Sequence, residues 1–172
     1  MAAWNEELLR RSRDASFEVE GVRNGKVFNA SRRVTAVASG ANTDSIFLTG
    51  GVPVVFFQRD IGRTGSGISA TIFQAPTYTG GTPASVYNVN ASSVAVSTIS
   101  LLASPTVTVT GTQISASAFA IGNTTGGGQG GLAQIGQPLY MKPNTAYLLR
   151  VTNLDAGSSD FSSFISWYEG YL

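Results

Sequence analysis

The sequence predicts an all-β protein built as an antiparallel β-sandwich. Three observations predict this class. Many short segments alternate apolar and polar residues, as strands with one buried face do. Turn residues, mainly glycine together with proline or asparagine, separate these segments at close spacing. Hydrophobic residues make up 42% of the 172 residues while the formal net charge is only +1, a combination that is typical of a folded chain rather than a disordered one.

The chain begins with a segment that we interpret as a short helix or arm, residues 1–16, ahead of a single sandwich domain over residues 17–172. Trp4 and Leu8 are four residues apart, which places them on one side of a helix over residues 3–14. Glutamates precede arginines along this segment, an order that suits the helix dipole. Because an isolated helix this short is marginal in water, it needs a partner surface, either its own sandwich or another subunit.

From residue 17 onward the hydrophobic period changes to two. Asn24 and Gly25 lie between apolar runs, and we expect this Asn-Gly pair to close a β-hairpin. Further strands are expected over residues 32–38, 45–48, 52–57, 68–73, 85–90, 94–99, 106–110, 114–121, 146–152 and 161–168. The glycine-rich residues 122–131 are expected to form a flexible loop. A jelly-roll-like barrel of about eight strands with extra ribbons accommodates this number of segments.

Charge is scarce and unevenly placed along the chain. Charged residues make up 12% of the sequence, against roughly 25% in an average soluble domain. Of the 21 charged residues, 12 lie in the first 33 positions, and tyrosine is the only ionisable residue between Arg63 and Lys142. A surface of Ser, Thr, Gly and Ala has little charge to oppose association, so we expect an obligate, cyclic oligomer. A neutral surface that stays exposed on a long-lived particle is the alternative.

Several chemistries lack the residues that they require. The chain has no cysteine and no histidine, which excludes disulfides, Ser-His-Asp catalysis and thiolate or imidazole metal sites. A net charge near zero argues against nucleic-acid binding, and no apolar run reaches the roughly 18 residues of a membrane span. The N-terminus is acidic where a signal peptide would be basic, so we expect synthesis in a cytoplasm. We predict a protein that is not an enzyme and binds no cofactor or metal.

Carboxylates are the remaining catalytic option, and aromatic residues the remaining option for a sugar site. Asp155 and Asp160 flank one loop, and we interpret them as turn-capping residues rather than a calcium site or a glycosidase pair. Trp167 and Tyr168 lie in a segment with large apolar groups on both faces, which favours packing between two layers. A sugar-stacking platform that also includes Tyr171 is the alternative.

The N-terminal arm is the candidate binding element. Its apolar residues would anchor in a groove of a partner protein, with arginines at the rim. The candidate partner-binding residues are Trp4, Leu8, Leu9, Arg10, Arg11 and Arg13. Together with Arg32 and Arg33, these arginines form the one basic concentration of the sequence. Because acidic residues lie among them, a solvated helix face is an equally open interpretation.

Several segments within residues 70–170 resemble structural proteins from the virions of tailed bacteriophages. These segments are FQAPTYTGGTP at 73–83, YNVN at 87–90, LYMKPNTAYLLRVTN at 139–153 and SWYE at 166–169. The chain is similar to small β-rich capsid decoration proteins, also called cement proteins. The resemblance implies a jelly-roll-like homotrimer on the outer surface of the capsid, where it would clamp neighbouring subunits of the major capsid protein.

The resemblance also implies partners and a location. The partners would be further copies of the chain and the major capsid protein, with no nucleic acid and no membrane. The protein would be made in the host cytoplasm and then reside in the virion. The alternative is a receptor- or glycan-binding module of a phage tail or fibre, and a glycan is a partner only in that case.

Overall fold

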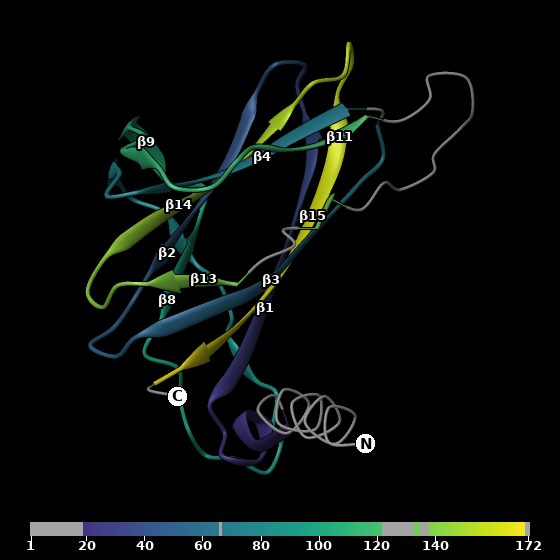
Figure 1. Ribbon diagram of the computed structural model, residues 1–172. Helices are drawn as coiled ribbons and strands as arrows, with labels where there is room; N and C mark the ends of the chain where they lie inside the picture. Colours follow the sequence, from purple (N-terminus) through teal and green to yellow (C-terminus); the bar gives the residue numbers. More distant parts are fainter. Residues whose placement is uncertain (1–18, 66, 122–132, 135–137, 171–172) are drawn as a thin grey trace, which may run out of the picture.

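The computed structural model describes residues 19–65, 67–121, 133–134 and 138–170 (Figure 1). Strands dominate, as the sequence predicts. In chain order they are β1 (Val27–Val37), β2 (Asn42–Leu48), β3 (Val54–Arg63), β4 (Gly67–Gln74), β5 (Thr77–Thr79), β6 (Thr82–Pro83), β7 (Tyr87–Asn88), β8 (Ser100–Ala103), β9 (Thr106–Val109), β10 (Thr112–Gln113), β11 (Ala118–Ile121), β12 (Ala133–Gln134), β13 (Leu139–Met141), β14 (Ala146–Asn153) and β15 (Ser159–Glu169).

Within the described part of the chain, these strands form the two sheets of an antiparallel sandwich. One sheet has the order β12-β3-β15-β1-β7, and β13 also pairs with β3. The facing sheet has the order β10-β4-β14-β2-β8-β6, and β11 also pairs with β4. Strands β5 and β9 pair only with each other. The long strands therefore occupy the middle of each sheet, and the short strands lie at the two edges.

The largest hydrophobic cluster lies between the sheets around Trp167, which is fully buried. The Trp167 ring contacts Phe47 edge-on at a centroid distance of 5.1 Å and lies nearly parallel to Phe28 at 6.3 Å. These side chains come from β15, β2 and β1, so the cluster joins the two sheets. Its position confirms that Trp167 of the closing strand packs in the core, and burial of such aromatic side chains supplies much of the stability of a sandwich.

A smaller cluster lies further along the same interior, around Ile61, Ile68 and Phe161. Between the two clusters, the inward positions of the strands carry polar side chains. Arg59 of β3 is the largest of these and is 1% exposed. The interior of the sandwich is therefore not continuously apolar.

The prediction of a hairpin at Asn24-Gly25 is wrong, because residues 19–23 form a short helix that ends there. The Lys26 amide donates to the Gly21 carbonyl at 2.9 Å, and the Gly25 amide donates to the Val22 carbonyl at 3.0 Å. This is the Schellman pattern of a helix end, and Gly25 has the positive φ of 66° that the pattern requires. Asn-Gly suits both structures because both need a left-handed residue.

Other predicted strands have mixed outcomes. Structure and prediction agree on the segments that became β1 to β4, β9, β14 and β15. The strand expected over residues 85–90 shrinks to the two residues of β7, and the strand expected over 94–99 is wrong, because residues 89–99 form a loop. The expected helix over 3–14 and the glycine-rich 122–131 lie outside the described residues. No helix in the described residues is long and apolar enough to cross a membrane.

Candidate interaction surfaces

The predicted partner-binding residues Trp4, Leu8, Leu9, Arg10, Arg11 and Arg13 lie outside the described residues. The basic concentration that was expected to continue at Arg32 and Arg33 does not form one surface there. Arg32 points between the sheets, where its guanidinium donates to Ser45 Oγ at 2.8 Å and Ser104 Oγ at 2.7 Å. Arg33 is exposed and pairs with Asp160 at 3.0 Å. Alternation along β1 separates these neighbours onto opposite faces.

The described carboxylates act as structural hydrogen-bond acceptors. Asp44 accepts two hydrogen bonds from Arg150, at 2.8 Å and 2.7 Å. Asp155 accepts from the Gly67 amide at 2.6 Å, which agrees with its interpretation as a turn-capping residue. Among the residues that the structure describes, no three His, Cys, Asp or Glu side chains come close enough to hold a metal ion.

Glu169 is a buried carboxylate with a structural role that the sequence did not predict. It accepts hydrogen bonds from the indole Nε1 of Trp167 at 2.9 Å and from the Thr98 amide at 2.8 Å. It also accepts from the hydroxyls of Thr98 and Ser97. These contacts hold the end of the 89–99 loop to the last residue of the central strand β15. The signal available in the sequence was the position of Glu169 directly after Trp167 and Tyr168.

Trp167 and Tyr168 are buried, so neither presents its ring to solvent as a sugar platform would require. Tyr168 packs with Val27 and Val55 against Val22 of the short helix. The Nζ of Lys26 lies over the Tyr168 ring, 5.7 Å from its centroid. The third aromatic residue of the expected platform, Tyr171, lies outside the described residues. The described geometry thus gives the sugar-stacking alternative no support.

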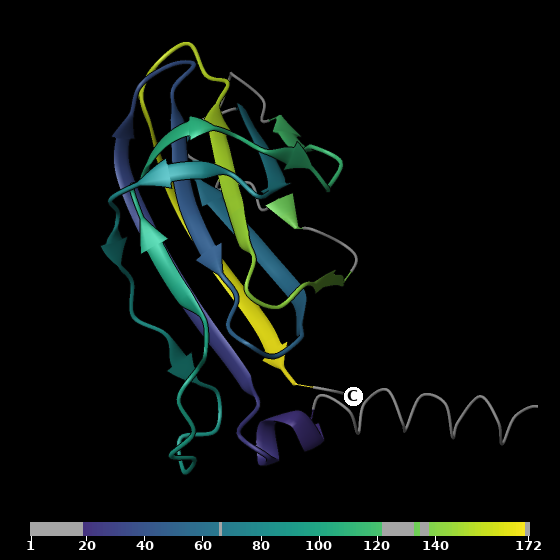
Figure 2. The ribbon, with the colours of Figure 1, turned by 90° about the vertical axis from the view of Figure 1, so that its left-hand side faces the viewer.

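Exposed apolar side chains gather at one edge of the sandwich, on β7 and the loop that follows it. We call Tyr87, Val89, Val94 and Val96 the β7 edge surface. Val94 is 97% exposed and Val96 86% exposed, although both are large aliphatic residues. The loop that carries them lies at the lower end of the sandwich beside the short helix (Figure 2). Exposed apolar groups that gather in this way mark interaction sites more often than isolated ones do.

Side-chain amides hold the β7 edge surface in place. Asn88 Nδ2 donates to the Gly25 carbonyl at 2.9 Å and to the Ala95 carbonyl at 3.2 Å. Asn90 Nδ2 donates to the Arg23 carbonyl at 3.1 Å. The loop is therefore fixed to the end of the short helix, and its valines are presented on a held backbone. A preordered surface loses less conformational entropy when it binds.

A groove of about 340 Å³ lies beside these valines. Its lining has no ionisable side chain and consists of Phe28, Pro83, Ala84, Val86, Asn88, Ala95, Val96, Ser97, Ile99, Ser100, Leu101 and Leu102. Most of these residues come from the uncharged stretch of the sequence. The groove and the exposed valines together form one continuous uncharged region.

The opposite edge of the sandwich carries two exposed aromatic side chains, one on each sheet. Phe119 of β11 is 64% exposed and Tyr140 of β13 is 74% exposed. Both strands pair at the far ends of their sheets from β7 and β6. We call these two residues the β11–β13 edge surface. The sandwich thus has two unlike apolar edges, neither of which carries a charged side chain at the residues named.

No protein-family model and no curated protein matches the chain. Among solved structures, the chain is similar to an Eiger TNF protein from S. frugiperda, with 10% identity, a TM-score of 0.29 and coverage of 81% of this chain and 90% of that chain. It is also similar to the VP2 subviral particle protein of infectious bursal disease virus, with 13% identity, a TM-score of 0.22 and coverage of 84% and 41%. Scores this low assign neither a fold family nor a function to the chain.

Proposed function

We propose that the protein is a structural component of a bacteriophage virion, a decoration protein that binds the outer surface of the capsid and stabilises contacts between major capsid protein subunits. The observation that carries the proposal is the pair of unlike, uncharged apolar edges on a rigid sandwich. The resemblance of the 73–83, 87–90, 139–153 and 166–169 segments to decoration proteins supplies the capsid as the partner.

The two edges have a consequence for assembly. When one surface meets a different surface on the next copy, the contacts are heterologous, and they close into a ring if the rotation allows. The β7 edge surface would contact the β11–β13 edge surface of a second copy of this chain. Because neither surface carries charge at the named residues, no like-charge repulsion opposes the contact. Three copies per ring is the number that the resemblance implies.

In this arrangement, the body of the protein makes the ring and the N-terminal arm meets the capsid. Trp4, Leu8 and Leu9 would anchor the arm in an apolar groove of the major capsid protein, with arginines at the rim. Such a clamp needs no chemistry, which suits a chain without histidine or cysteine.

The ring is tested by the mass of the protein in solution. The double substitution Val94→Asp and Val96→Asp places two carboxylates in the β7 edge surface and should convert the oligomer into monomers on light scattering. Ala156→Asp adds a carboxylate to the exposed loop between β14 and β15 and should leave the mass unchanged. Unchanged mass in the double variant would show that this edge is not the contact between copies.

The capsid role is tested separately, by the location of the protein in an electron cryomicroscopy map of its particle. Copies that follow the capsid lattice support decoration, whereas copies confined to the tail contradict it and favour the receptor-binding alternative. Deletion of residues 1–16 should leave a folded oligomer that no longer binds capsids. A truncated protein that still decorates shells would exclude the arm as the binding element.

A further inference from the structure

The interior of the sandwich contains a layer of polar side chains, which we call the polar layer. It lies between the cluster around Trp167 and the cluster around Phe161. Inward positions of four strands supply it, namely Arg32 of β1, Thr43 and Ser45 of β2, Arg59 of β3 and Ser163 of β15. A small cavity of about 30 Å³ opens among these side chains.

Arg59 is a buried cation without a carboxylate partner among the described residues. Its Nη1 donates to the Thr71 carbonyl at 3.4 Å and its Nη2 to the Arg150 carbonyl at 3.2 Å, both of which are long contacts. Its Nε has no hydrogen-bond partner. Burial lowers the pKa of Arg59 to about 10, so the guanidinium is still protonated at neutral pH. A buried and incompletely bonded charge is costly unless a counter-charge is supplied.

The cavity offers a second unsatisfied group. Thr43 Oγ1 is buried and has no hydrogen-bond partner, and Thr43 lines the same cavity as Arg59. Arg32 closes the cavity on the β1 side with its bonds to Ser45 and Ser104. Two guanidinium groups and several hydroxyls therefore line this space, and no carboxylate is among the described residues that line it.

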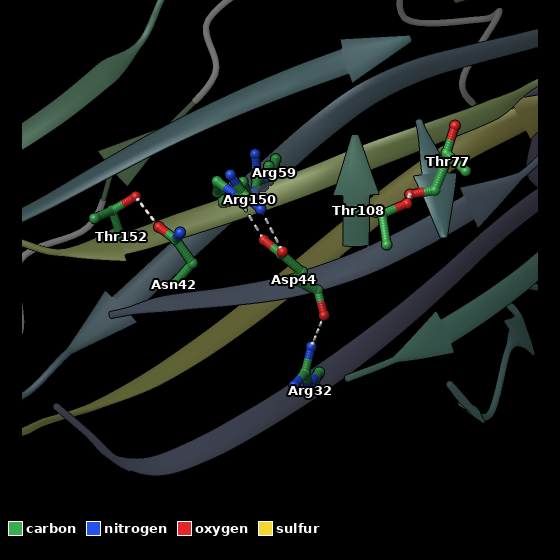
Figure 3. Close-up of polar contacts among 8 residues, drawn as sticks. All are labelled: Arg32, Asn42, Asp44, Arg59, Thr77, Thr108, Arg150 and Thr152. Atoms are coloured by element: carbon green, nitrogen blue, oxygen red, sulfur yellow. Dashed lines mark hydrogen bonds and ion pairs between the residues drawn. The ribbon is translucent and has the colours of Figure 1, made fainter. Parts of the chain in front are cut away.

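The surrounding charges do not balance within the protein. Asp44 of β2 lies near this layer, and Figure 3 shows it between Arg150 and Arg32. Its two oxygens are already engaged by Arg150 on the outer side of its sheet. The Coulomb attraction of Asp44 raises the pKa of Arg32, but desolvation by burial lowers it more. Arg32 and Arg59 both line the cavity, and no carboxylate is among the described residues that line it, so the cavity has a local excess of positive charge.

We propose that the cavity binds a small monovalent inorganic anion of the size of chloride, held by Arg59 Nε and Thr43 Oγ1. A water molecule needs roughly 10–15 Å³ of such space, so about 30 Å³ is enough for one monatomic anion. The anion satisfies both unpartnered donors and offsets the excess positive charge. It acts as an internal counter-ion that links the two sheets, and this inference does not depend on where the protein binds in a virion.

The decisive measurement is anomalous diffraction from crystals of the full chain soaked in bromide. A bromide peak within contact distance of Arg59 Nε and Thr43 Oγ1 is the expected result. Density without an anomalous signal at that position would mean that water fills the cavity, and the proposal would be wrong.

Solution stability supplies an independent readout. At ten times its dissociation constant, a bound anion should raise the Tm of a chain this size by about 4 °C. Chloride and bromide should raise Tm above its value in sulfate at equal ionic strength. The general effect of these salts runs the other way, because excluded ions such as sulfate stabilise folded proteins. A Tm that is highest in sulfate would contradict the proposal.

Variants separate the site from the fold. Arg59→Met removes the charged guanidinium and keeps an unbranched apolar stem, and it should abolish both the bromide peak and the halide dependence of Tm. Thr43→Val keeps nearly the same shape without the hydroxyl and should shift the halide dependence to higher concentrations. Arg33→Met removes an exposed arginine paired with Asp160 and should leave the halide dependence unchanged. A halide dependence that survives in Arg59→Met would exclude this cavity as its source.

Discussion

The charged flanks of the chain and its uncharged middle build different parts of the same sandwich. The flanks, residues 19–63 and 142–170, supply β1, β2, β3, β14 and β15, which occupy central positions in the two sheets. The uncharged stretch, residues 64–141, supplies the edge strands β6, β7 and β10 to β13. Two of its strands lie inside a sheet, β4 between β10 and β14 and β8 between β2 and β6.

The charged residues of the two regions differ in what they contact. In the flanks, several charged side chains are buried or paired between strands. Examples are the Asp44–Arg150 pair, the Arg59 guanidinium and the Glu169 carboxylate. Exposed strand edges in monomeric proteins usually carry charge that keeps them from associating. The edges of this sandwich lack that protection and expose large apolar side chains instead. The flanks therefore hold the fold together, and the middle supplies surface that is suited to contact with other molecules.

The largest expected loss of stability comes from a substitution in the core that the flanks build. Trp167→Ala should lower the free energy of unfolding by about 3–5 kcal/mol, because it removes a fully buried ring and leaves a cavity between Phe28 and Phe47. The comparison change in the uncharged stretch, Val109→Ala in β9, truncates an exposed side chain outside both edge surfaces and should alter stability by less than about 0.5 kcal/mol. Chemical denaturation of the two variants measures both values. Equal losses in the two variants would contradict the division between a stabilising core in the flanks and an exposed surface in the middle.

The next effect concerns the charge pair in the flanks. Asp44→Asn keeps the shape of the side chain but removes the charge that faces Arg150, and it should cost about 2 kcal/mol. The pair is mostly buried, so its hydrogen bonds are not strongly screened by water. Gln113→Ala, an exposed polar truncation at the edge strand β10, should cost less than about 0.5 kcal/mol. A loss of similar size in both variants would contradict the division between flanks and middle.

The sequence predicted the flanks better than the middle, and the reason is physical. Segments 45–48, 146–152 and 161–168 pair along much of their length with two neighbours, and their alternation reports a real buried face. The segment 94–99 alternates equally well, yet it forms a loop with exposed valines. Alternation identifies a strand only when one face meets a core, and the 89–99 segment presents its valines to solvent.

The polar interior could not be predicted from the sequence. Arg59 lies in the polar second half of β3, between Gln58 and Asp60, and an arginine in such a segment is usually placed on the outer face. Its inward direction follows from an irregularity in the pairing of β3 with β15 between Ser166 and Trp167. One extra residue on β3 at that point changes which side chains face the core. Such a bulge leaves no clear mark in composition or spacing.

A smaller effect tests a tightly constrained glycine of the uncharged middle. Gly111 has a φ of 82°, and a Cβ there would collide with the carbonyl oxygen of Gln74. Gly111→Ala should therefore cost about 1–3 kcal/mol, through strain and the close approach to β4. Gly80 also has a positive φ, of 64°, but a Cβ there meets nothing within 4 Å. Gly80→Ala should cost less, and thermal melts of the two variants give the comparison.

The smallest expected effect lies at the acid end of the pH range and concerns a charge in the flanks that remains at the surface. Asp160 accepts hydrogen bonds from the Ala36 amide and from Arg33, each at 3.0 Å. These contacts, the Ala36 amide first, lower the pKa of Asp160 below its ordinary value of 3.8. Ala36 has a positive φ of 54° next to the irregularity in β1, so the carboxylate also holds a strained turn.

The sign of the pH dependence follows from that lowered pKa. The stabilisation by Asp160 is fully present above its unfolded pKa and is lost as pH falls through the lower folded pKa. Asp160→Asn should therefore be less stable than the natural chain at neutral pH, and the difference should shrink as the solution is acidified below pH 4. Denaturation at a series of pH values measures it, with carboxyl NMR titration giving the pKa directly. A difference that stays constant down to strong acid would mean that the amide contact to Ala36, rather than the charge, supplies the stabilisation.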